Sequence, residues 1–343
     1  MDRIRGKMRY ARACIIFLAA VLLSCATVTG PPVSKEEQRL ARVEILERKL
    51  KSYFACQDRV GDTLNRILEH LRDPSGKAYP YVGIKAVNLT KLDKDEREAF
   101  QRVEGVVLPD KGYLILYLPP FYRKKGVRAF DVLDPEQKNI TPELGKSFLL
   151  HFLDGRTLEL KPEKIHTAPV KFYVVDTTMI NAWVTPGNNL YVTTAMCRTL
   201  PDDDELAIII GHELGHLKRN HLKKRMPLYY AYGILGMIAG SLGGRPGYEA
   251  YRTAATFAFM KFSRDQEREA DFFGMMFAHE AGFKVEKAED AWLRLATVLP
   301  GSAKKSYLST HPLTSERLAR MKKIVAMLKK GKSFQEIMKE STK

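Results

Sequence analysis

The chain has 343 residues, of which 45% are hydrophobic and 28% charged, a composition that fits globular protein and excludes intrinsic disorder. Its length suffices for two domains, or for one large domain with an extension. The net charge is +16, but the basic residues are scattered and form no zinc finger, RNP-type run or long basic and aromatic stripe, so nucleic acid is not an expected partner.

Residues 1–25 have the features of an export signal. A basic start precedes the apolar run Ala13–Leu23, which has the length of a signal-peptide core and is shorter than the roughly 20 residues that cross a bilayer. Leu22-Leu23-Ser24-Cys25 resembles the bacterial lipobox, which implies a lipid anchor at Cys25 and a location in the cell envelope or periplasm. Ala26, where an aspartate often retains lipoproteins at the inner membrane, favours the outer membrane. An ordinary cleaved signal or a short uncleaved anchor is the alternative.

Residues 26–78 are predicted to be an N-terminal helical segment. From position 34 to about 72, apolar residues recur every three or four positions, and Gly61 suggests two helices. Cys56 in this segment and Cys197 further along the chain could pair in an oxidising compartment. Two separate buried thiols are the alternative, because the sequence gives no distance between them.

Residues 79–165 read as a small β-rich domain, because short apolar runs alternate with turn residues. The runs are Tyr81–Val87, Val103–Leu108, Tyr113–Leu118, Phe148–Leu153 and Thr157–Leu160. Within this region, Gly126–Leu133 resembles a stretch of bacterial PDZ domains, with Phe130 where those domains have glycine. The resemblance implies a PDZ-like domain, and an unrelated β-rich insertion is the alternative.

Residues 166–328 are predicted to form the largest domain, and residues 329–343 a basic C-terminal tail. Val170–Val175 and Leu190–Thr194 are candidate strands, and long helical segments follow them. The apolar stretch Leu228–Leu242 is too short to cross a bilayer, and a buried helix is favoured over a membrane-dipping hairpin. The predicted fold class is therefore α+β: a mainly helical domain with a small edge β-sheet, preceded by the β-rich domain and N-terminal helices.

His212-Glu213-Leu214-Gly215-His216 is an HExxH motif, and a helix is expected to begin near Asp203 and pass through it. Asp202 and Glu205 have the spacing of a capping box at its start. On such a helix, the two histidines lie about 40° apart and can reach one metal ion. Glu213 projects about 100° from His212, where it can approach a water molecule.

A catalytic zinc site needs a third protein ligand and an open position for water. Glu267 and Asp271 are four residues apart and share a helix face. We assign Glu267 as the third ligand and Asp271 as the acceptor that orients a ligand histidine by hydrogen bonding to its ring N–H. Glu269 lies on the opposite side of this helix, and His221 lies about 180° from His212, so neither is an expected ligand.

Residues from about Val170 to Met321 resemble the HtpX-like and CAAX-prenyl-protease family of zinc metallopeptidases, which are gluzincins. The resemblance rests on an ordered set of short motifs that includes the two metal motifs. The others are Asn181-Ala182, Pro186-Gly187, Leu190–Thr194, Asp204–Ala207, Ser263-Arg264 and Thr310-His311-Pro312 with Arg317. The family implies a zincin-type peptidase fold, one zinc ion per chain, and extended polypeptide substrates.

The resemblance also implies roles for residues outside the two metal motifs. A strand beside the metal helix receives substrate by β-addition, and we place this edge at Asn189, Leu190, Tyr191 and Val192. His311 matches a histidine that in some periplasmic relatives ligates zinc and blocks the water position. It could be such a switch, a transition-state hydrogen-bond donor or a structural residue. Arg317 is expected to be structural, and contact with the oxyanion is the alternative.

Two functional hypotheses follow. The first is a zinc-dependent metalloendopeptidase that hydrolyses misfolded or stalled membrane and outer-membrane proteins, with Glu213 as general base. The second is a periplasmic chaperone or assembly factor with a latent zinc site that His311 blocks. The sequence indicates neither the cleavage preference nor the oligomeric state.

Overall fold

The computed structural model describes residues 31–73, 75–137, 140–225, 235, 262–299 and 306–341. The predicted signal segment with Cys25, and the apolar stretch 228–242 apart from Leu235, lie outside the described residues. The chain divides into two compact units, Met1–Ile45 and Leu46–Lys343. Everything that positions the candidate site belongs to the second unit.

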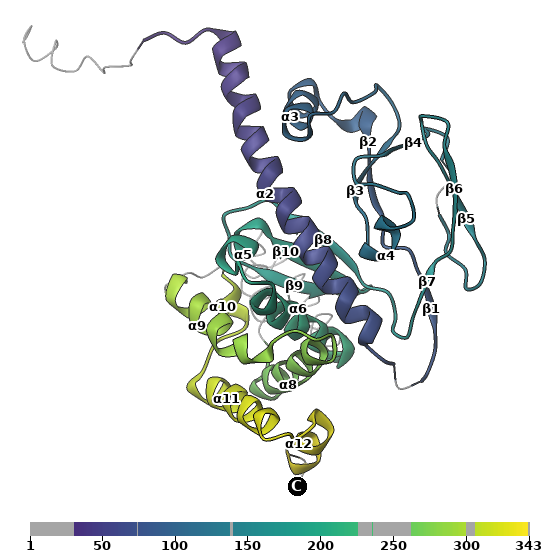
Figure 1. The fold of residues 1–343 in the computed structure, drawn as a ribbon. Helices are drawn as coiled ribbons and strands as arrows, with labels where there is room; N and C mark the ends of the chain where they lie inside the picture. The colour runs from purple at the N-terminus through teal and green to yellow at the C-terminus, as the bar shows by residue number, and fades with distance from the viewer. Residues whose placement is uncertain are drawn as a thin grey trace, which may run out of the picture. The chain divides into compact units, whose positions relative to one another are not determined.

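Helices and small sheets alternate along the described chain, so the predicted α+β class is confirmed (Figure 1). The described helices are α2 (Lys35–His70), α3 (Lys94–Glu104), α4 (Pro120–Arg123), α5 (Thr194–Thr199), α6 (Asp203–Lys218), α8 (Arg264–Glu280), α9 (Ala288–Val298), α10 (Tyr307–Thr310), α11 (Ser315–Lys329) and α12 (Phe334–Ser341). The described strands are β1 (Tyr79–Tyr81), β2 (Lys85–Asn88), β3 (Tyr113–Tyr117), β4 (Val132–Leu133), β5 (Phe148–His151), β6 (Thr157–Leu160), β7 (Glu163–Ile165), β8 (Lys171–Val175), β9 (Ala182–Thr185) and β10 (Asn189–Thr193).

Helix α2 is a single helix, where the sequence analysis predicted two. Gly61 does not break it. The ring of Tyr117 packs against the helix at this point, and a β-carbon on Gly61 would lie 2.3 Å from Cε2 of that ring. Glycine is therefore needed here for close packing, not for a turn, and the helix tolerates its lower propensity.

Residues 79–165 form three small antiparallel sheets, with strand orders β1-β7, β2-β3-β4 and β5-β6. The run Val103–Leu108, predicted as a strand, is not one. Helix α3 extends to Glu104, and a capping box between Asp93 and Glu96 starts it.

Phe130 has a φ angle of 68°, in the left-handed region that favours glycine. Its ring makes edge contacts with Phe54 and Phe100, at centroid distances of 5.6 and 5.5 Å. This aromatic packing holds the strained backbone in place. The PDZ-like assignment of residues 79–165 stays a prediction.

The sheet next to the metal helix has the strand order β8-β10-β9. Strand β10 pairs with β8 in parallel and with β9 in antiparallel register. The predicted substrate edge Asn189–Val192 is therefore wrong, because β10 is the central strand and both its sides are paired. Strand β9, which was not predicted from the sequence, forms a hairpin with β10 through a turn at Gly187 and Asn188, both with positive φ.

Helices α6 and α8 lie side by side because small residues line their contact (Figure 1). A β-carbon on Gly211 would lie 2.5 Å from the carbonyl oxygen of Gly274, and one on Gly274 would lie 2.6 Å from the backbone nitrogen of His212. One turn along, a β-carbon on Gly215 would lie 2.7 Å from the carbonyl oxygen of Ala270. The two helices thus touch backbone to backbone.

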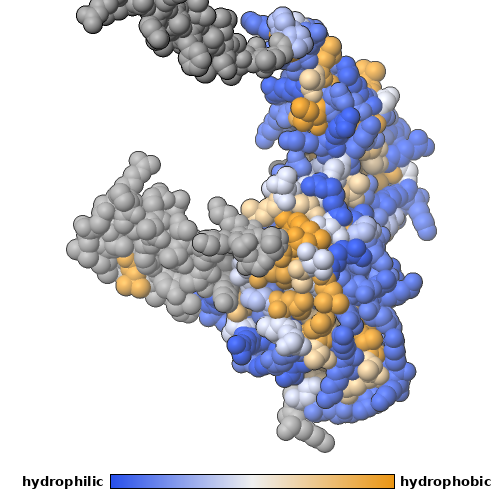
Figure 2. Space-filling model, turned by 90° about the vertical axis from the view of Figure 1, so that its left-hand side faces the viewer, coloured by the Kyte–Doolittle hydropathy of each residue, from blue (hydrophilic) through white to orange (hydrophobic). Residues whose placement is uncertain are grey.

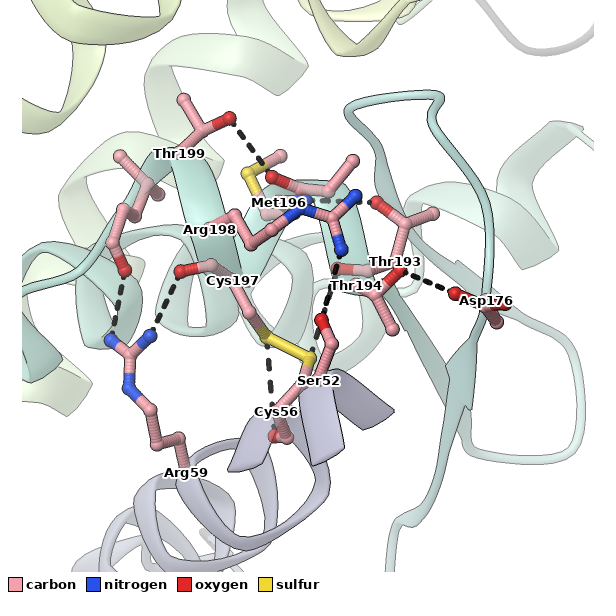
Figure 3. Close-up of a disulfide and its surroundings, with 12 residues drawn as sticks. Ser52, Cys56, Arg59, Asp176, Thr193, Thr194, Met196, Cys197, Arg198 and Thr199 are labelled. Atoms are coloured by element: carbon pink, nitrogen blue, oxygen red, sulfur yellow. Dashed lines mark hydrogen bonds between the residues drawn. A yellow bond between two sulfur atoms is a disulfide. The ribbon is translucent and has the colours of Figure 1, made fainter. Parts of the chain in front are cut away.

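Cys56 of α2 and Cys197 of α5 form a disulfide, the first of the two alternatives left open by the sequence (Figure 3). Beside it, Arg59 donates hydrogen bonds to the carbonyl oxygens of Cys197 and Leu200, at 2.9 and 2.8 Å. Arg59 also pairs with Asp203 in the first turn of α6. Helix α2 is therefore tied to the start of the metal-motif helix by one covalent bond and several polar contacts.

The predicted C-terminal tail is partly folded, because residues 334–341 form α12, in which Phe334 and Ile337 are buried. No helix among the described residues has the length and apolar character needed to cross a bilayer. On the face shown in Figure 2, the described surface is mostly hydrophilic, with hydrophobic residues gathered towards its middle.

Gly274→Ala is expected to separate α6 from α8, because the added methyl group would collide with backbone atoms of Gly211 and His212. We expect at least about a tenfold loss of affinity for zinc, measured by chelator competition, with a thermal destabilisation of about 1–3 kcal/mol. Ala270→Gly is the control, because it weakens α8 by about 1 kcal/mol without adding an atom to the contact. Equal zinc affinities of the two variants would contradict the packing argument.

Candidate metal centre

Helix α6 presents His212, Glu213 and His216 within its buried part. Asp202 caps its start by accepting a hydrogen bond from the backbone of Asp204. The predicted capping box with Glu205 does not form. Glu205 is instead buried and accepts two hydrogen bonds of 3.0 Å from Arg294.

Helix α8 presents Glu267 and Asp271, both buried, from its first two turns. Ser263 and Gln266 form a capping box that fixes the start of the helix. Since α8 packs closely along α6, these two carboxylates face the histidines of the HExxH motif.

Four buried side chains converge at this point: His212, His216, Glu267 and His311, each offering one ligand atom within 4.8 Å of the others. Nε2 of His212 and Nε2 of His216 are 3.1 Å apart, and each lies 3.5 Å from an oxygen of Glu267. Ligand atoms held about 2.0–2.1 Å from a tetrahedral ion are about 3.3 Å apart. The spacing therefore fits a metal ion of zinc size.

The hydrogen bonds around the two histidines also indicate a metal site. Nδ1 of His212 lies 2.9 Å from Oδ1 of Asp271, an acceptor, so we assign the proton to Nδ1 and the lone pair to Nε2. For His216 we likewise assign the proton to Nδ1, which contacts His221, and the lone pair to Nε2. Two lone pairs then face each other across 3.1 Å beside a carboxylate, an arrangement that a cation between them stabilises.

The electrostatics of the site favour positive charge. Burial lowers the pKa of His212, but hydrogen bonds to Asp271 and Glu267 outweigh it and raise the value to about 9. Nε2 of His212 therefore holds a cation beside Glu267, either a proton or, with the imidazole neutral, a metal ion. Burial raises the pKa of Glu267, yet the neighbouring histidines hold it far below its usual value, so this carboxylate is ionised. Burial lowers the pKa of His216 well below its usual value, which keeps that imidazole neutral.

A chain of hydrogen-bonded polar groups, which the sequence did not indicate, orients the ring of His216. Nδ1 of His216 lies 2.9 Å from Nδ1 of the fully buried His221, whose Nε2 lies 2.7 Å from Oε2 of Glu269. Arg219 donates to the other oxygen of Glu269. Because Glu269 accepts the Nε2 proton of His221, Nδ1 of His221 can accept the Nδ1 proton of His216. This chain leaves Nε2 of His216 free as a ligand.

Arg317 is buried between the two carboxylates of α8. It forms two hydrogen bonds of 2.7 Å with Asp271, and its Nη1 lies 3.0 Å from Oε2 of Glu267. Its guanidinium also lies over the ring of Trp292. These contacts hold both carboxylates in place, which is the structural role expected from the sequence.

Helix α10 and the residue after it bring two further groups to the site. The hydroxyl of Tyr307, fully buried, donates a 3.0 Å hydrogen bond to Oε1 of Glu213. Nδ1 of His311 lies 3.2 Å from Nε2 of His212 and 3.1 Å from Oε1 of Glu267. The structure thus places His311 among the ligand atoms. Sequence reasoning did not identify Tyr307, whose only signal is its position four residues before His311.

Glu213 lies beside the ligand group without belonging to it. Burial raises its pKa, and the charges of His311 and His212 and the Tyr307 hydrogen bond oppose that rise. Its Oε1 is 3.6 Å from Nε2 of His311. The structure therefore brings together all the predicted site residues of the two metal motifs and His311, and the predicted edge Asn189–Val192 is the exception.

The region that holds this site is similar to known proteins. Residues 157–325, just under half of the chain, match peptidase family M48. The region is 27% identical over 148 residues to the mitochondrial metalloendopeptidase OMA1 of Saccharomyces cerevisiae, covering 42% of this chain and 43% of that protein. It is 31% identical over 144 residues to the Arabidopsis thaliana OMA1, covering 42% and 29% of the two chains. It is 29% identical over 177 residues to the beta-barrel assembly-enhancing protease of Yersinia pestis, covering 48% and 36%.

Residues 157–325 are thus similar to peptidase family M48, whose members use a metal, and the same region is similar to proteins named as metalloendopeptidases. The aligned regions span less than half the length of each of these relatives. The residues that converge in the structure, with two imidazoles and a carboxylate as donors, fit such a metal.

His221→Phe is expected to lower the affinity for zinc about 10–100-fold, because the ring loses both nitrogens and the Nδ1 proton of His216 loses its acceptor. Chelator competition measures this, with circular dichroism to establish folding. His151→Phe, an exposed position in β5, is the matched control and should bind zinc normally. Unchanged affinity in folded His221→Phe would show that the chain to Glu269 does not orient His216.

Proposed function

We propose that the chain is a zinc metalloendopeptidase that cleaves polypeptides of the cell envelope. The observation that supports this most is the convergence of His212, His216 and Glu267 beside the buried Glu213. Two neutral imidazoles and one carboxylate are a donor set typical of catalytic zinc sites. When bound there, zinc lowers the pKa of water towards ~7 and polarises the scissile carbonyl.

Glu213 is the proposed general base. Its carboxylate accepts the proton of the attacking water and passes it to the leaving amine. The Tyr307 hydroxyl, which donates to Oε1 of Glu213, fixes the orientation of this carboxylate. Asp271 and His221 hold the two ligand imidazoles by their Nδ1 sides, so neither ring can rotate away from the reacting groups.

We place the substrate-binding edge at β9, not at β10. β9 is the antiparallel outer strand of the sheet and packs against α6, which carries the HExxH motif. In β9, Ala182 and Val184 are buried, while Trp183 and Thr185 are partly exposed. An extended substrate that pairs with the free side of β9 would run past the metal helix.

We further propose that the described form is a resting form. His311 lies among the ligand atoms, so with three other protein ligands it would fill the position that the attacking water needs. Hydrolysis then requires His311 to withdraw. It lies directly after the short helix α10, which also carries the Glu213 partner Tyr307, so one movement would free the water position and release Glu213.

An exported, lipid-anchored location is part of the proposal. It rests on the signal-like start and Cys25, and on the Cys56–Cys197 disulfide, because disulfides persist in oxidising compartments. The Yersinia relative carries a name that refers to β-barrel assembly. From this name we propose misfolded or stalled membrane and outer-membrane proteins as substrates. The HtpX-like assignment and the location at the outer membrane are also proposals.

A second candidate function is that of a chaperone or assembly factor whose metal site stays latent. The position of His311 among the ligands favours it, because a four-ligand site resembles the closed sites of structural zinc proteins. The two candidate functions differ in whether the protein needs the Glu213 carboxylate to function in the cell.

Glu213→Gln is expected to reduce cleavage of an unfolded protein such as casein by at least about 100-fold, since the amide cannot accept the proton. Zinc content, measured by atomic emission, should be unchanged because Glu213 is not a ligand. Glu280→Gln, the same change at the exposed end of α8, is the control. If Glu213→Gln complements a deletion strain fully while zinc stays bound, the chaperone hypothesis replaces the peptidase.

His311→Ala is expected to raise the casein cleavage rate several-fold, because it opens a ligand position. The measurement is initial rate at equal zinc occupancy, so that any loss of metal is separated from the gain. His279→Ala, on the exposed end of α8, serves as the control. A fall in rate at full occupancy would instead make His311 a group that the reaction requires, and the resting-form proposal would be wrong.

A further inference from the structure

Three aromatic rings form a row across the sheet that lies beside α6. Tyr173 of β8 stacks on Tyr191 of β10, with a centroid distance of 4.9 Å and an angle of 19° between the ring planes. Tyr191 in turn stacks on Trp183 of β9, with a distance of 5.1 Å and an angle of 5°. The three residues are direct partners in the strand register, so the row runs at right angles to the strands.

This row stands on the face of the sheet that is turned away from the core. Along β9, Ala182 and Val184 are buried while Trp183 is half-buried, and the aromatic residues of β8 and β10 likewise alternate with buried neighbours. Successive residues of a strand point to opposite faces, so the rings lie opposite the side that packs on α6. The three rings are therefore not needed to fill the core behind the sheet.

One end of the row is covered and the other is open. At the β8 end, Nζ of Lys85 lies 4.9 Å from the centroid of the Tyr173 ring. At the β9 end, the described chain places neither a ring nor a cation on the second face of the Trp183 indole. Within the described ranges, β9 pairs only with β10, so the row ends at an unpaired strand edge.

The backbone of β9 determines how a further strand would lie. Thr193 donates its backbone N–H to the carbonyl oxygen of Asn181, so hydrogen-bonded pairs occur at every second residue from there. The peptide groups of Trp183 consequently face β10, and those of Ala182 and Val184 face the free side. An antiparallel strand that bonds to these two residues places one residue directly opposite Trp183, in the closer, non-hydrogen-bonded type of pair.

The spacing of the row fits a fourth ring on such a strand. Neighbouring strands lie about 4.8 Å apart, close to the centroid distances within the row. Because the indole of Trp183 is nearly parallel to the Tyr191 ring, its second face is turned towards the free edge. An aromatic side chain opposite Trp183 would therefore continue the row, in a stacked arrangement that stabilises aromatic pairs beyond the apolar area they bury.

We propose that Trp183 selects substrates that carry an aromatic side chain at the position paired with it on β9. This role of Trp183 rests on the proposed function, because it takes β9 as the substrate edge. Since β9 packs against α6, which carries the HExxH motif, the selected position lies at a fixed distance from the cut bond. The selected side chain points away from α6, so Trp183 determines which substrate binds and takes no part in the chemistry.

The test compares two labelled peptides by fluorescence anisotropy. Both are short chains of alternating threonine and valine with blocked ends, and the central residue is phenylalanine in one and cyclohexylalanine, its saturated counterpart, in the other. The full chain carries Glu213→Gln, so that neither peptide is cleaved. We expect the phenylalanine peptide to bind about two- to tenfold more tightly, which is the contribution of an aromatic pair beyond buried area. A purely hydrophobic contact would instead favour the saturated ring, which is the more apolar of the two.

Variants at the two ends of the row test the residue itself. Trp183→Val should remove the preference for phenylalanine, and Trp183→Phe should keep most of it. Tyr173→Val is the matched control, because it removes a ring from the same face of the sheet at the end away from the free edge. Circular dichroism establishes folding, and if Trp183→Val does not fold, the comparison of the two peptides on the unaltered strand still decides.

Three results would overturn the role of Trp183. They are equal or tighter binding of the cyclohexylalanine peptide, a preference for phenylalanine that persists in Trp183→Val, and absence of binding at about 1 mM peptide. These measurements use an inactive variant, so they do not depend on whether the protein is a peptidase.

Cleavage by the active protein gives a second readout. Sites identified by mass spectrometry in an unfolded protein should have phenylalanine, tyrosine or tryptophan at one fixed distance from the cut bond, and Trp183→Val should lose this preference. Cleavage without such a position would contradict the role of Trp183. Absence of cleavage with an intact difference between the two peptides would count against the proposed function alone.

Discussion

The close contact of α6 and α8 is the constraint on which the rest of the site depends. The HExxH motif supplies two imidazoles one turn apart, but Glu267 comes from a different helix 51 positions further along the chain than His216. It reaches the same point only because Gly211, Gly215 and Gly274 allow the helix backbones to touch. A side chain at any of the three would hold the helices apart. The glycine inside the motif is therefore a packing requirement as much as the histidines are a chemical one.

The sequence predicted those features of the site that depend on one helix. Helical phasing placed His212 with His216 and Glu267 with Asp271, and the structure brings these four side chains together. The same reasoning left His221 out of the ligand group, as the structure does, but gave no sign of its contact with His216. The helical projection put it opposite His212, but α6 ends at Lys218 and Asn220 has a positive φ, so the chain turns back. His221 consequently contacts His216, which no projection along a continuous helix could indicate.

Strand order depends on pairing partners, which local patterns do not encode. The turn at Gly187 and Asn188 was visible, yet β9 has only four residues and alternates buried and half-buried ones. The family resemblance implies a substrate edge on the strand before the metal helix, and without β9 the sequence gives no sign that β10 is paired on both sides. Helix α3 was not predicted, although Asp93 and Glu96 form a capping box, because the apolar run Val103–Leu108, which overlaps its end, resembles a strand. Long-range pairing, including the Cys56–Cys197 bond, required the coordinates.

That disulfide has a consequence for a protein that cuts other chains. Its two cysteines are 141 residues apart, and the intervening stretch contains all the strands of the β-rich region and of the sheet beside α6. A nick in any of the connecting turns would leave both fragments covalently joined and the metal motifs on one piece. Damage by a neighbouring copy would then be tolerated without dissociation, and it would be seen in electrophoresis only after reduction.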